Sequence, residues 1–154
     1  MKFSGSKTIY KGGKELPFFT SELEWESLEK EVGKLIRSGE KVFCAANLSH
    51  FQLKKKYPEI ILKTIPPFPV SNRLAAEESA RIGAAMVHAH VELPEDESFS
   101  IKQGSPIPVE EYQGNPVLLA TRASVKAKGT LKTVQGMRFR IEKRGEFTCI
   151  LEDI

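Results

Sequence analysis

The hydrophobic pattern of this chain of 154 residues changes its period near the middle, and that change restricts the fold more than any other feature. Between residues 21 and 86, apolar side chains recur at helical intervals or gather in short apolar runs. After Pro94 the helix signals stop, and glycines separate segments short enough to be strands. The pattern predicts an α+β fold, in which a helical N-terminal part packs with an antiparallel C-terminal sheet or a small, partly open barrel.

One domain over residues 1–154 is the expected organisation, with a helix-containing part at 1–93 and an antiparallel part at 94–154. Hydrophobic residues make up 40% of the chain, and a chain of this length buries roughly two-thirds of its unfolded surface. No apolar run approaches the roughly 20 residues that span a bilayer. We therefore expect a soluble, cytoplasmic protein with no membrane partner.

Three helices are predicted, at about residues 21–38, 49–57 and 73–86. The first has the clearest signals, because Ser21 and Glu24 have the spacing of a capping box and Gly39 provides a stop. Short apolar runs at 42–48 and 60–65 flank the second helix and are typical of buried strands. Residues 42–65 are therefore expected to form one strand, helix, strand unit.

Residues 86–93 alternate with period two, which predicts a strand. On that strand His88, His90 and Glu92 would project to the same side, because side chains two apart share a face. Two imidazoles and a carboxylate are suitable ligands for a divalent transition metal such as Zn²⁺. This arrangement gives one functional alternative, a metal-dependent hydrolase in which Glu95 acts as general base.

The leading functional hypothesis rests on basic residues in the predicted C-terminal strands. Arg138 and Arg140 alternate with Phe139 and Ile141, so the two cations are expected to share a sheet face. A face of that kind engages several phosphates at once and needs no cofactor. We therefore expect a binding protein for nucleic acid or another polyanion, with contacts from Arg122, Lys126, Lys128, Lys132, Arg138, Arg140, Lys143 and Arg144.

A small-ligand site is predicted near Asn47, Ser49 and His50. If 42–48 is a parallel strand, these residues lie at its carboxyl end and at the start of a helix, where open α/β sheets bind ligands. Cys44 and Cys149 are interpreted as buried free thiols, with a catalytic pairing of Cys44 and His50 as the alternative.

Opposed charge blocks give a third functional class. Residues 75–112 hold two basic and eight acidic residues, a net charge of −6, whereas 121–147 hold eight basic and two acidic residues, a net charge of +6. Such blocks favour a homo-oligomer or a regulatory protein interface. The sequence does not decide whether the protein is an enzyme, nor does it distinguish RNA from DNA.

Overall fold

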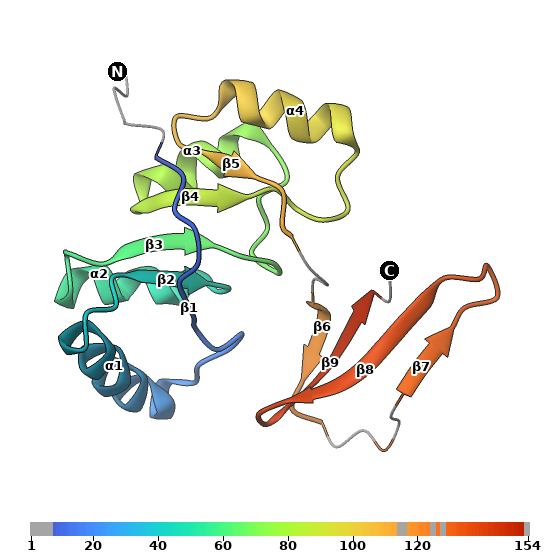
Figure 1. Cartoon of the computed structure of the whole chain (residues 1–154), viewed down its shortest axis with the longest axis horizontal. Coiled ribbons are helices and arrows are strands. Elements are labelled where there is room, and N and C mark those ends of the chain that lie inside the picture. Colours follow the sequence, from blue (N-terminus) through green and yellow to red (C-terminus); the bar gives the residue numbers. More distant parts are fainter. Residues whose placement is uncertain (1–7, 114–116, 124–125, 127–128, 153–154) are drawn as a thin grey trace. The chain divides into compact units, whose positions relative to one another are not determined.

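The computed structural model describes residues 8–113, 117–123, 126 and 129–152, and the chain divides into two compact units, Met1–Glu111 and Tyr112–Ile154 (Figure 1). Each unit is described by itself, and the single-domain organisation stays a prediction. The combination of helices, a parallel sheet and an antiparallel sheet confirms a mixed α+β fold. None of the helices in the described parts is long and apolar enough to cross a membrane.

The first unit contains a five-stranded parallel sheet whose strands follow one another in chain order. The strands are β1 (Lys14–Glu15), β2 (Val42–Ala45), β3 (Ile61–Thr64), β4 (Ala84–His88) and β5 (Val109–Glu110). The connecting helices are α1 (Glu22–Arg37), η1 (Leu48–Gln52), α2 (Leu53–Lys56), α3 (Arg73–Arg81) and α4 (Glu95–Gly104). Parallel crossovers are almost always right-handed, so this strand order directs the helices to one face of the sheet.

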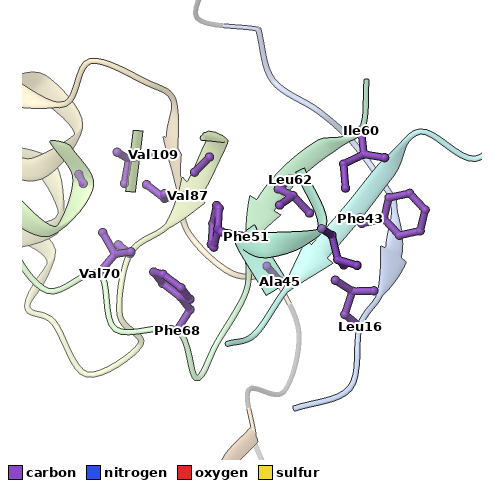
Figure 2. Packing of buried hydrophobic residues seen from close by; sticks show 14 of the residues in the cluster. Leu16, Phe43, Ala45, Phe51, Ile60, Leu62, Phe68, Val70, Val87 and Val109 are labelled. Carbon is purple, nitrogen blue, oxygen red and sulfur yellow. The ribbon is translucent and has the colours of Figure 1, made fainter. Parts of the chain in front are cut away.

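The apolar core lies on that helix-covered face. Phe43, Leu62 and Val87, from the three central strands, belong to one buried cluster with residues of the helices (Figure 2). The helices contribute Leu28, Val32, Phe51, Leu53, Ala76 and Ile101. The strand register agrees, since Phe43 pairs with Leu62 and the two side chains therefore share a side. Cys44 and Met86 are buried but belong to the opposite face and not to this cluster.

Two sequence predictions in this unit are confirmed. The first helix begins where expected, and the Ser21 backbone N–H donates to the Glu24 carboxylate at 2.7 Å, as a capping box requires. Strands β2 and β3 pair in parallel around η1 and α2, so residues 42–65 form the predicted strand, helix, strand unit.

Four expectations were wrong. The third helix ends at Arg81 and not at 86, because Gly83 adopts φ +107° and ends the turn before β4. The strand expected at 86–93 ends at His88. Residues after Pro94 are not purely antiparallel, since α4 and the parallel strand β5 precede Tyr112. The N-terminal part is also not simply helical, because β1 precedes α1 and strands alternate with helices.

The second unit is a four-stranded antiparallel sheet in the order β6-β9-β8-β7. Its strands are β6 (Val117–Thr121), β7 (Gly129–Lys132), β8 (Arg138–Arg144) and β9 (Phe147–Glu152). β6 and β7 form the two edges, so the described residues make an open sheet. Both sides of its centre carry buried side chains, because the register places Ile141 of β8 on one side and Cys149 and Leu151 of β9 on the other.

Candidate functional sites

The predicted metal ligands do not converge. His88 closes β4, and its ring Nδ1 forms a hydrogen bond with the Thr64 carbonyl oxygen. His90 lies beyond the strand, where its backbone N–H donates to the Val70 carbonyl at 2.9 Å. Its Nδ1 is 4.0 Å from the carboxylate of Glu92, a side chain that is 78% exposed. Because the strand ends at His88, the expected alternation of these three side chains on one face is absent.

The rest of the metal hypothesis receives no support either. Glu95, the expected general base, opens the first turn of α4. Nowhere in the described parts of the chain do three His, Cys, Asp or Glu side chains gather as a metal ion would need. Burial is the main cause that lowers the pKa of His88, so its ring favours the neutral form.

The carboxyl end of β2 borders a pocket of about 420 Å³, within the range of small-molecule sites. Asn47 lines this pocket, and its Oδ1 accepts a hydrogen bond from the Ser49 backbone N–H at 2.9 Å. The lining is mainly apolar and comprises Ala46, Asn47, Leu48, Phe68, Pro69, Ala75, Glu78, Ser79 and Ile82. Of the three residues predicted for a small ligand, Asn47 alone belongs to this lining.

His50 is fully buried, and neither ring nitrogen bonds to a described residue. Burial lowers the pKa of His50 to about 4, so the imidazole is neutral at physiological pH. The Cys44 thiol lies 3.8 Å from the Gly12 carbonyl oxygen, and burial raises its pKa. A raised pKa keeps the thiol protonated, which opposes the role of an activated nucleophile.

The basic C-terminal strands show the predicted alternation. Arg138 and Arg140 lie on the opposite side of β8 from Phe139 and Ile141, because neighbouring residues of a strand face opposite sides. The register of β7 and β8 pairs Lys132 with Arg138, so these two cations lie directly opposite each other on the same side. We call Lys132, Arg138 and Arg140 the cationic side of the β7–β8 ribbon.

Other predicted contact residues are engaged within the unit. Arg140 and Arg144 both form ion pairs with Glu142, at 3.6 and 2.6 Å. Arg122 pairs with Glu146 at 2.8 Å and lies over the Phe147 ring. Lys143 is exposed on the other side of β8, opposite Thr148. Lys126 is exposed, and Lys128 lies outside the described residues.

Sequence reasoning missed Lys63, which lies in the middle of β3. Only 7% of the surface of Lys63 is exposed, and its Nζ donates to the Tyr10 carbonyl oxygen at 3.2 Å. One signal was present, since Lys63 interrupts the apolar run at 60–65 at a point where a buried strand would carry an apolar residue.

No family model matches the chain, and neither a curated protein nor a solved structure is significantly similar to it.

Proposed function

We propose that the C-terminal unit binds a polyanion, in particular the phosphate backbone of a nucleic acid, through the cationic side of the β7–β8 ribbon. The observation that carries this proposal is the direct opposition of Lys132 and Arg138 on adjacent strands.

Like charges that face each other across a strand pair destabilise the sheet, since their Cβ atoms are only about 5 Å apart. Lys132 and Arg138 are both exposed, and neither forms an ion pair with any described residue. An anion bound between them removes the repulsion and gains two charge-assisted hydrogen bonds. The arrangement is thus costly for the free sheet and favourable for a complex with phosphate.

The expected contact is with the backbone of the nucleic acid and not with its bases. Reading single-stranded bases requires exposed aromatic side chains on which they stack. Phe147 is buried, and Phe139 is half-buried on the opposite side of β8 from the cationic side. Binding through phosphates alone is insensitive to sequence and falls steeply with salt, because bound counterions are released.

The test is fluorescence anisotropy with a labelled single-stranded RNA of about 20 nucleotides and mixed sequence, over a series of salt concentrations. Removal of two phosphate contacts in the Lys132→Gln, Arg138→Gln variant should weaken binding at least about tenfold at low salt and reduce the salt slope by about 1.4. The matched control removes two exposed lysines of the first unit, Lys34→Gln and Lys55→Gln, and should change neither quantity by as much.

Equal affinity of the wild-type protein and the Lys132→Gln, Arg138→Gln variant would overturn the proposal. A DNA strand of the same sequence provides the second comparison. Similar affinities for RNA and DNA are expected from backbone contacts, whereas a strong preference for one of them contradicts recognition through phosphates alone.

A further inference from the structure

We propose that the N-terminal unit contains a separate binding site for a small oxyanion, of the carboxylate or phosphate class, centred on the ammonium group of Lys63. The site lies on the face of the parallel sheet opposite the helices. It does not depend on the cationic side of the C-terminal unit.

The strand register defines this helix-free face. Cys44 pairs with Lys63, and Lys63 pairs with Met86, so the three side chains share one side of the sheet. None of them belongs to the apolar cluster under the helices. Lys63 therefore occupies the central strand of a face that the helices of this unit do not cover.

Lys63 is a buried residue with no ion-pair partner among the described residues. Its residue is 7% exposed, and the Tyr10 carbonyl is the only hydrogen-bond acceptor that a described residue offers it. It forms no ion pair within the described parts of the chain. An ammonium group has three donors, and a buried cation is costly unless a charge of the opposite sign compensates it.

Two carboxylates of the same face form no ion pair with Lys63. Glu15 lies on β1 in register with Cys44, and Glu110 lies on β5 in register with His88. Each is two strands away from β3. With strands about 4.8 Å apart, the backbones of these residues lie about 10 Å from β3, so an ion pair with Lys63 would need both side chains to lean toward each other.

The segment Thr8–Gly13, which we call the strap, restricts the size of the ligand. It crosses the helix-free face before it reaches β1 (Figure 1). The Tyr10 carbonyl contacts Lys63, and the Gly12 carbonyl is 3.8 Å from the Cys44 sulfur. Because the strap contacts both side chains, the structure favours an anion small enough to reach the remaining Lys63 donors beside it.

The test measures thermal unfolding in inorganic phosphate and in sodium chloride of equal ionic strength. The Lys132→Gln, Arg138→Gln background removes the two cations on which the proposed polyanion site of the other unit depends, so failure of one proposal does not affect the other. Trp25, the only tryptophan, lies on α1 and reports on the first unit. Phosphate at ten times its Kd should increase the ratio of folded to unfolded protein about elevenfold.

Lys63→Met in this background should abolish the phosphate effect. The matched control is Lys54→Met, because the Lys54 Nζ also donates to a backbone carbonyl, that of Ile60 at 2.9 Å, but from α2 on the helix-covered face. The control should keep the full effect. Sodium acetate in place of phosphate distinguishes the two kinds of oxyanion: an effect of either salt that Lys63→Met removes supports the site.

Absence of an effect of both salts in the background protein would overturn the proposal, as would an equal effect in the Lys63→Met variant. If that variant does not fold, reductive methylation of the background protein replaces it. Phosphate should slow methylation of Lys63 several-fold relative to Lys54, measured by peptide mass spectrometry. Equal protection of the two lysines contradicts a site at Lys63.

Discussion

The two units carry cations in opposite environments. In the first, Lys63 is buried on the helix-free face of a sheet, and its ammonium meets one neutral carbonyl. In the second, Lys132 and Arg138 are exposed and oppose each other across β7 and β8. Charges in a low-dielectric interior interact strongly and are little screened, whereas exposed charges are weakened by salt. The two proposed sites should therefore differ in the salt dependence of their binding, which should be weak at Lys63 and strong at Lys132 and Arg138.

The largest expected effect tests whether the two units differ in packing. Leu62→Ala and Leu151→Ala both remove a fully buried side chain, on β3 and on β9 respectively. We expect Leu62→Ala to cost about 4 kcal/mol, because the helices enclose the cavity, and Leu151→Ala about 2.5 kcal/mol, because a single sheet relaxes more easily. Urea unfolding followed by Trp25 fluorescence measures the first, and hydrogen exchange of β8 and β9 amides the second. Equal losses of stability in the two variants would show that the two units do not differ in packing.

The next effect concerns a buried imidazole of the first unit. The pKa of His50 is about 4 in the folded chain and about 6.5 when unfolded. The unfolded chain therefore binds the proton first, and stability present above pH 6.5 is lost as the pH falls toward 4. The loss due to His50 should be about 3 kcal/mol.

Urea unfolding at pH 7.5, 6, 5 and 4 measures this dependence, again through Trp25. His50→Leu should flatten the profile, whereas the control His90→Gln should leave most of it in place. His88 also contributes to the loss of stability as the pH falls, because burial lowers the pKa of His88 too. A profile that is as steep in His50→Leu as in the wild type would show that His50 is not the group responsible.

The smallest effect tests the cost of the opposed cations. Lys132→Thr removes one member of the pair and should stabilise the free C-terminal unit by about 0.5 kcal/mol at low salt. The gain should disappear at high salt, because screening weakens the repulsion in the wild type. Lys143→Thr is the control, since Lys143 lies opposite Thr148 and not opposite a cation. Hydrogen exchange of β8 amides at two salt concentrations detects the difference, and equal results for both variants would contradict it.

The sequence predicted best the elements whose limits are set by local chemistry. The capping residues Ser21 and Glu24 and the stop at Gly39 define α1 without reference to the rest of the chain. The period-two pattern of β8 likewise predicted that Arg138 and Arg140 lie on one side of the strand and Phe139 and Ile141 on the other. In both cases a short segment contains the whole signal.

The elements that were missed depend on weak or distant signals. In α4 few residues are buried, among them Ser98 and Ile101, so no amphipathic stripe reveals it. Its start signal is a run of three acidic residues after Pro94, and the metal hypothesis assigned the first of them, Glu95, the role of general base instead. The sequential order of the five parallel strands is set by pairing across the chain, which local periodicity does not contain.

The same reasoning applies to the candidate sites. Alternation predicted which basic residues share a side, but the ion pairs of Glu142 with Arg140 and Arg144 reduce the number of free cations. The histidine pair failed because its argument required β4 to continue beyond His88. Lys63 was missed because a lysine in an apolar run indicates a site only when the strand register shows which face of the sheet it occupies.

The strap has a consequence for the order of events during folding. Tyr10 and Lys63, which hold it in place, are 53 residues apart in the chain. Contacts of such long sequence separation form late, because the intervening chain must first be ordered. Residues 8–13 leave the ribosome well before β3, yet they acquire a binding partner only when β3 has taken its place in the sheet. The strap is therefore synthesised before its partner strand β3 but docks only after that strand is in place.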